Sequence, residues 1–140
     1  MTRRNSRITI SSNQSQTFLQ RDFERSLFFC LYYVTMSVVY LIKDEVVELY
    51  KIGVAKDPHR RLQKLQTGNP HRLSIIYTYE TEYPFRLETL LHNKFRNQRV
   101  LNEWYELTDK QVLGFSPTCE EQNNIIYAML DNPFFNKNLK

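Results

Sequence analysis

The stretch that decides the fold runs from Val38 to Arg61 and reads VVYLIKDEVVELYKIGVAKDPHRR. Residues 38–42 form a β-branched and aromatic run, and the polar residues 43–45 follow it. A second apolar run starts at Val46 and ends before Gly53. Two such runs separated by a few polar residues favour an antiparallel hairpin.

A helix is expected directly after this hairpin. Asp57 is suited to the N-cap because its carboxylate can accept from unpaired backbone amides, and Pro58 suits the first helical position. The helix should run to about Gln66, and Gly68 should stop it. Arg60 and Arg61 then lie in its first turns.

Further elements are expected downstream. Residues 71–80 indicate a third strand, whose run of Ile75, Ile76 and Tyr77 suits a central strand covered on both faces. A second helix should start at Pro84 and reach about Asn97. Residues 102–107 form a plausible short strand.

A final helix is expected over about residues 119–130, where Thr118 and Glu121 have capping-box spacing. The fold class is therefore α/β (α+β), with a small mixed or antiparallel three-stranded sheet, flanking helices and an added C-terminal helix. Residues 36–107 should form the main domain, and residues 108–140 a helical extension packed on it.

Residues 1–35 are expected to be a disordered or poorly packed leader, because Ser, Thr, Asn, Gln and Arg dominate residues 1–20. A basic arm on nucleic acid is the functional alternative. A start of translation at Met36 is a further hypothesis.

The formal charge of +4 hints at a polyanionic partner. The first 35 residues carry a net +3 and residues 36–140 only +1, so any basic face must be local. Cys30 and Cys119 are far apart in sequence and predict free thiols in a reducing compartment. An intracellular, soluble protein is therefore expected.

Residues 27–42 contain no charged side chain. These sixteen residues fall short of the roughly 20 that span a bilayer. No stable membrane association is expected, although a membrane-associated or protein-interaction role stays open as an alternative.

Several blocks of the chain, taken in order, resemble the GIY-YIG nuclease superfamily, and within it the phage-type DNA-binding and meiotically up-regulated-type subfamily. The resemblance covers roughly residues 37–107. Its blocks are Val38–Tyr40, Tyr50–Gly53, Pro58–Pro70, Glu88–His92 and Glu103–Tyr105. Each is weak alone, but together they are specific.

The resemblance implies an endonuclease that hydrolyses DNA with one Mg²⁺ or Mn²⁺ ion. Glu88 matches the metal-binding glutamate, and magnesium accepts one or two protein carboxylates. Arg61 matches the catalytic arginine, whose guanidinium can contact phosphate through two hydrogen bonds. Tyr40 matches the tyrosine that orients or deprotonates the attacking water. Without the resemblance, each would be read as a surface or packing residue.

Lys51 departs from the tyrosine of the better-known nucleases. It can contact phosphate, or act as a base only if burial lowers its pKa. His92, four residues after Glu88 on the same helical face, is another candidate base. Trp104 is expected in the core, with base stacking as the alternative.

Three more basic residues, Lys56, Arg60 and Lys64, are expected to bind DNA. An enzyme is favoured, and a DNA-binding module of the same fold that does not cleave is the closest alternative. Such a module should bind DNA in a salt-sensitive manner without cutting it.

Overall fold

The structure is a computed structural model that describes residues 21, 24–25 and 36–136. The chain divides between Thr35 and Met36 into two units, and the account below concerns the second unit. The predictions about the leader, about Cys30 and about residues 27–35 of the apolar run fall outside the described residues.

The described fold is a five-stranded antiparallel sheet with helices on both faces. The strands follow the spatial order β3-β1-β2-β5-β4. In chain order the elements are β1 (Val38–Asp44), β2 (Tyr50–Ala55), α2 (Pro58–Thr67), β3 (Leu73–Glu80), α3 (Pro84–Lys94), the 3₁₀ turn η1 (Arg96–Gln98), β4 (Arg99–Leu101), β5 (Trp104–Tyr105), α4 (Asp109–Leu113), α5 (Phe115–Leu130) and α6 (Pro133–Asn136).

The mixed α/β class is confirmed, although the sheet has five strands rather than three. The prediction that the third strand is central was wrong. β3 is an edge strand, and β1 lies between β3 and β2. Residues 39–42 of β1 are at most 1% exposed, whereas β3 alternates between half-buried and exposed residues from Ile75 onward. A short apolar run therefore did not distinguish a covered strand from an edge strand.

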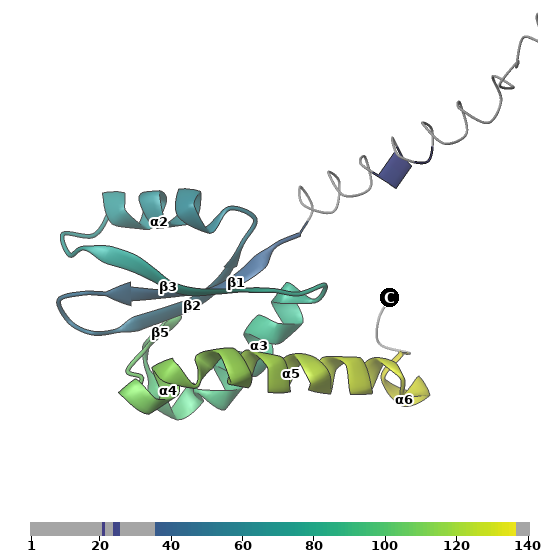
Figure 1. The fold of residues 1–140 in the computed structure, drawn as a ribbon. Coiled ribbons are helices and arrows are strands. Elements are labelled where there is room, and N and C mark those ends of the chain that lie inside the picture. Colours follow the sequence, from purple (N-terminus) through teal and green to yellow (C-terminus); the bar gives the residue numbers. More distant parts are fainter. Residues whose placement is uncertain (1–20, 22–23, 26–35, 137–140) are drawn as a thin grey trace, which may run out of the picture. The chain divides into compact units, whose positions relative to one another are not determined.

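The sheet has a helix layer on each face, with α2 on one side and α3 and α5 on the other (Figure 1). Val39 and Leu41 face the larger core, which includes residues of α3 and α5. Tyr40 and Ile42 face the smaller cluster under α2. This alternation follows from the period of two in a strand. Trp104 packs against the smaller cluster but is only partly buried.

The helix boundaries test the capping predictions. Asp57 is the N-cap of α2 and accepts from the Arg60 amide at 3.0 Å, as predicted. The capping box predicted at Thr118 was wrong, because α5 already begins at Phe115. A proline is tolerated in a first helical turn, so Pro117 did not mark a boundary. The capping box lies instead at Thr108, at the start of α4.

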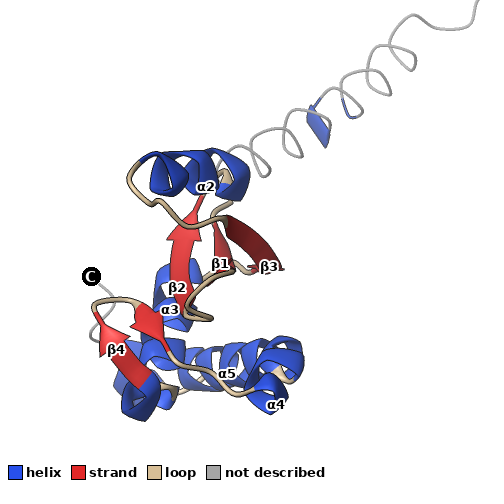
Figure 2. Cartoon of the chain, turned by 90° about the vertical axis from the view of Figure 1, so that its left-hand side faces the viewer, coloured by secondary structure: helices blue, strands red, loops and turns tan. Residues whose placement is uncertain are grey.

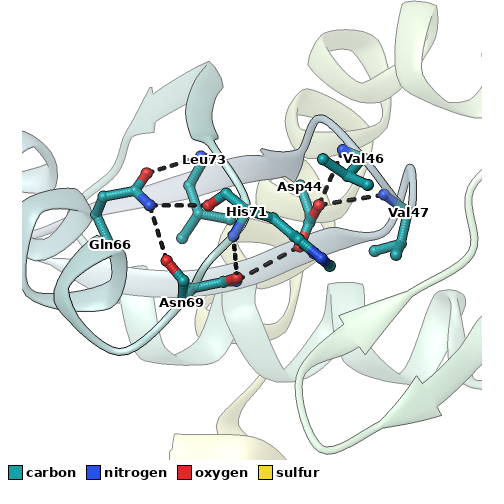
Figure 3. A network of polar contacts seen from close by, with 7 residues as sticks. All are labelled: Asp44, Val46, Val47, Gln66, Asn69, His71 and Leu73. Atoms are coloured by element: carbon teal, nitrogen blue, oxygen red, sulfur yellow. Dashed lines mark hydrogen bonds and ion pairs between the residues drawn. The ribbon is translucent and has the colours of Figure 1, made fainter.

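A buried carboxylate ties the β1–β2 turn to the α2–β3 loop (Figure 3). Asp44, 4% exposed, accepts from the backbone amides of Val46 at 3.0 Å and Val47 at 3.2 Å. It also accepts from His71 Nδ1 at 3.0 Å and Asn69 Nδ2 at 3.4 Å. The two loops are therefore fixed to each other.

Gln66, near the end of α2, extends this network (Figure 3). Its Nε2 donates to the carbonyls of Asn69 at 3.1 Å and His71 at 2.8 Å, and its Oε1 accepts from the Leu73 amide at 2.8 Å. One amide side chain thus satisfies three backbone groups and holds α2 to the start of β3.

Candidate functional site

The first part of the site is a close approach between two paired strands. Tyr40 on β1 lies opposite Gly53 on β2. A Cβ atom on residue 53 would come within 2.4 Å of the Tyr40 hydroxyl oxygen. Glycine is required here by space, since Gly53 has no positive φ. The phenol of Tyr40 therefore lies across Gly53, and the side chain is 1% exposed.

Charged side chains surround this phenol. Burial raises the pKa of Tyr40, while the Arg61 side chain opposes that shift as a hydrogen-bond partner and as a positive charge. The negative charges of Glu103 and Glu88 raise the pKa further. The hydroxyl consequently keeps its proton at neutral pH, and the charged groups that act on it come from α2, α3 and the β4–β5 turn.

Lys51 lies on the same face of the sheet as Tyr40, because Lys51 pairs with Ile42. It is 6% exposed, and its ammonium group forms an ion pair with Glu103. The ammonium nitrogen lies 5.9 Å from the centroid of the Trp104 ring. Tyr50 belongs to the core on the opposite face, so it does not replace the missing tyrosine.

Glu103 is a site residue that the sequence prediction missed. Burial raises its pKa, but the hydrogen bond and charge of Lys51 outweigh that effect and leave the pKa below its usual value. The preceding residue, Asn102, has a φ of 51° in the turn between β4 and β5. Asparagine tolerates this left-handed conformation better than most residues. The Glu103–Tyr105 block could be seen in the sequence. Only the pairing of β2 with β5 shows that Glu103 lies beside Lys51.

Next to this turn, the backbone of Ile52 in β2 forms hydrogen bonds with the Glu103 backbone and with the His92 side chain. β5 pairs only with Tyr50 and Lys51, so Ile52 has no strand partner on that side. The Ile52 amide donates to the Glu103 carbonyl at 3.2 Å, and its carbonyl accepts from His92 Nε2 at 3.0 Å. Both backbone groups are thereby satisfied.

Glu88 and His92 share one face of α3, as their spacing predicted. Burial raises the pKa of Glu88 above its usual value of 4.5, and the charge of His92 acts against that rise. Glu88 Oε1 lies 4.0 Å from His92 Nε2. Because a carbonyl can only accept, His92 Nε2 must carry a proton in this arrangement.

The basic residues of the first helix surround a pocket of about 410 Å³ at the start of α2. All the residues expected to bind DNA line it, together with Arg61 and the end of β2. The lining residues are Val54, Ala55, Lys56, Asp57, Arg60, Arg61 and Lys64. Four cationic side chains against one carboxylate make this pocket suitable for an anion such as phosphate.

The residues also bear on the expected metal ion. Among residues 21, 24–25 and 36–136, no group of three or more His, Cys, Asp or Glu side chains could hold a metal ion. A Zn²⁺ site of the usual kind is therefore not found in that part of the chain. Glu88 alone remains compatible with Mg²⁺, which keeps several waters and accepts a single carboxylate.

The T5orf172 domain matches residues 33–116, which include every site residue described above. The chain belongs to the T5orf172 domain family. Membership of this family is consistent with a nuclease or DNA-binding role.

The chain is also similar to a viral protein. "Uncharacterized protein 460R" of Invertebrate iridescent virus 6 is 33% identical over 112 residues, which cover 74% of this chain and 44% of that protein. The chain thus spans less than half of this relative. No solved structure matches. Within the described residues, no helix is both long and apolar enough to cross a bilayer.

Proposed function

We propose that this T5orf172 domain is a metal-dependent endonuclease of the GIY-YIG type that hydrolyses phosphodiester bonds in DNA. The observation that supports it best is that the buried phenol of Tyr40 interacts electrostatically with both Arg61 and Glu88. These residues come from three elements, and a cation, a carboxylate and a hydroxyl are the groups that phosphodiester hydrolysis requires.

Arg61 would bind the phosphate that is cut. Its side chain is exposed on α2, yet it interacts with the Tyr40 hydroxyl, so it can reach a phosphate from solvent and hold it beside the phenol. A guanidinium stays protonated at working pH and stabilises the negative charge that develops on the phosphate oxygens.

Tyr40 and Lys51 would position the attacking water. The raised pKa of Tyr40 leaves a hydroxyl group that both donates and accepts hydrogen bonds at neutral pH. Lys51 supplies a positive charge on the same sheet face, and Glu103 holds its ammonium group in place. Lys51 therefore acts by charge rather than as the phenol that its position has in the better-known nucleases.

Glu88 would hold one Mg²⁺ or Mn²⁺ ion, which stabilises negative charge on the leaving oxygen when it is bound. His92 would keep Glu88 and β2 aligned, since its Nε2–H is engaged with the Ile52 carbonyl. A role of His92 as general base would require its other ring nitrogen.

The test is nicking of supercoiled plasmid with Mg²⁺, with Mn²⁺ and with EDTA. We expect metal-dependent nicking that falls at least a hundredfold in Glu88→Gln and in Arg61→Ala. The matched controls are Glu82→Gln and Arg72→Ala, which change exposed residues outside the site. Nicking that survives in both site variants would contradict the proposal.

A DNA-binding module without cleavage is the second candidate. The ion pair between Lys51 and Glu103 favours it, because an ammonium group held by a carboxylate stands at the position where the better-known nucleases have the phenol of the second tyrosine. A folded protein that shifts DNA in a salt-sensitive manner, but nicks with neither metal, would establish this alternative.

A further inference from the structure

A row of three side chains crosses the sheet beside the site. Lys51 on β2 pairs with Trp104 on β5, and Trp104 pairs with Leu101 on β4. Residues directly opposite each other in antiparallel strands project from the same face, with Cβ atoms about 5 Å apart. Leu101 and Trp104, here called the hairpin surface, therefore continue the site face away from Lys51.

The hairpin surface is open to solvent although it is apolar. Leu101 is 66% exposed, and Trp104 is only partly buried. Figure 2 shows α2 near the end of β2 and β4 near the beginning of β2, so α2 and β4 lie toward opposite ends of that strand. The other face of this hairpin is covered, because Tyr105 belongs to the main core.

The hairpin surface is also fixed relative to the site. The turn that joins its two strands holds Lys51 through the Glu103 carboxylate and the Ile52 amide through the Glu103 carbonyl. A group bound at Leu101 would therefore sit at a set position from the phosphate that Arg61 would hold.

We propose that the hairpin surface receives the base of an unpaired nucleotide beside the phosphate that is cut. This inference rests on the proposed function and names its substrate class, which is DNA with unpaired nucleotides at the cut site. An apolar surface that adjoins the Lys51 ammonium group fits a nucleotide, because a nucleotide carries a flat aromatic base that the deoxyribose links to a phosphate. In an intact duplex, neighbouring bases cover the faces of each base, so only an unpaired base can offer one.

A single exposed leucine would not support this inference, because such residues are common on protein surfaces. The support comes from its position opposite the only tryptophan of the chain, whose ring centroid lies 5.9 Å from the ammonium nitrogen of Lys51. Aromatic side chains beside a positive groove are how proteins bind single strands without a strict sequence preference. A second copy of the chain, paired through β4, is the competing occupant.

The emission of Trp104 provides a direct test, because no other tryptophan contributes. We would titrate the full chain in EDTA with a paired DNA duplex and with the same duplex carrying an unpaired loop. We expect the looped DNA to quench the emission and to bind roughly tenfold more tightly than the paired DNA. Leu101→Ser should remove this difference, whereas Leu113→Ser, which changes an 85% exposed leucine on α4, should retain it.

The outcomes separate this inference from the proposed function. Equal quenching and affinity for the two DNAs, or a preference unchanged in Leu101→Ser, would overturn it even if the protein nicks plasmid. A preference for looped DNA that Glu88→Gln retains while losing nicking would support both. Emission that changes with protein concentration alone would overturn the inference in favour of a second copy. Failure to bind either DNA would also overturn the inference, whereas the proposed function is decided by nicking with metal.

Discussion

At the scale of single residues, the site depends on the close contact between Tyr40 and Gly53, where a larger side chain would not fit. The Tyr40 hydroxyl lies over Gly53, and the strand register sets this position before any ligand binds. The glycine is thus a requirement of the neighbouring tyrosine rather than of its own backbone conformation.

Gly53→Ala should displace the phenol. The added methyl group would meet the Tyr40 hydroxyl at 2.4 Å, so the ring must move from its present position. We expect nicking to fall at least tenfold and the free energy of unfolding to fall by about 1–3 kcal/mol. Plasmid nicking and urea unfolding measure the two effects, and Gly68→Ala, where a Cβ meets nothing within 4 Å, is the control. Full activity in Gly53→Ala would contradict the role of this contact.

The ionised Glu88 carboxylate should lower the stability of the folded chain at neutral pH. Burial raises its pKa above 4.5, so its ionised form is less favourable in the folded than in the unfolded chain. Its contribution to stability is fully present below pH 4.5 and is lost as the pH rises through the folded-state pKa. Glu88→Gln should therefore unfold at a higher temperature than the wild type at neutral pH, while nicking is lost.

Thermal unfolding at neutral pH and below pH 4.5 checks this expectation, since the difference should shrink in acid. The exposed Glu82→Gln should show no such difference. A lower unfolding temperature for Glu88→Gln at neutral pH would mean that the carboxylate stabilises the fold.

At the scale of elements, short sequence patterns located most helices and strands but did not show which strands pair with each other. The Asp57 cap and the β1–β2 hairpin follow from residues adjacent in sequence, and both are observed. The edge position of β3 depends on which strands pair, and the role of Glu103 depends on a strand register between Lys51 and Trp104. Neither is encoded in a short window of sequence.

The candidate site shows the same division. Family motifs pointed to Tyr40, Arg61 and Glu88, which the fold brings together. The metal ion, the catalytic roles and the DNA contacts remain predictions. Glu103 could be recognised only in the fold, because its partner lies 52 residues away in the chain.

The loop network around Asp44 should hold the sheet against α2. Burial raises the pKa of Asp44, but hydrogen bonds from two backbone amides, His71 and Asn69 outweigh this and leave it below 3.8. Its contribution to stability is present above pH 3.8 and is lost as the pH falls through the folded-state pKa. Asp44→Asn should lower the free energy of unfolding by about 1–3 kcal/mol at neutral pH.

Urea unfolding at neutral and acidic pH measures this loss, which should diminish in acid. Asp109→Asn, at an exposed position in the first turn of α4, is the matched control. An equal loss in both variants would indicate a general effect of charge rather than the Asp44 network.

At the scale of the whole molecule, charge is concentrated rather than abundant. Residues 36–140 carry a net charge of only +1, yet four cationic side chains line the pocket at the start of α2. Binding of a polyanion should therefore depend on one face of this unit rather than on its total charge.

Neutralising this face should change how DNA binding responds to salt. Lys56→Gln, Arg60→Gln and Lys64→Gln should each reduce the slope of log K against log salt by roughly 1, because each removes one phosphate contact. Lys110→Gln on α4, across the sheet from α2 (Figure 1), removes the same charge and should leave the slope unchanged. Fluorescence anisotropy at several salt concentrations measures the slopes, and equal changes in all four variants would argue for total charge instead.

The position of β4 has a consequence for how such domains can diverge. All three of its residues are exposed, and it pairs with β5 alone at the end of the sheet. Substitutions at Val100 and Leu101 would thus alter the surface beside the site without disturbing the core. Descendants of one ancestral gene could acquire different targets by changing this short strand, while the residues proposed for hydrolysis stayed the same.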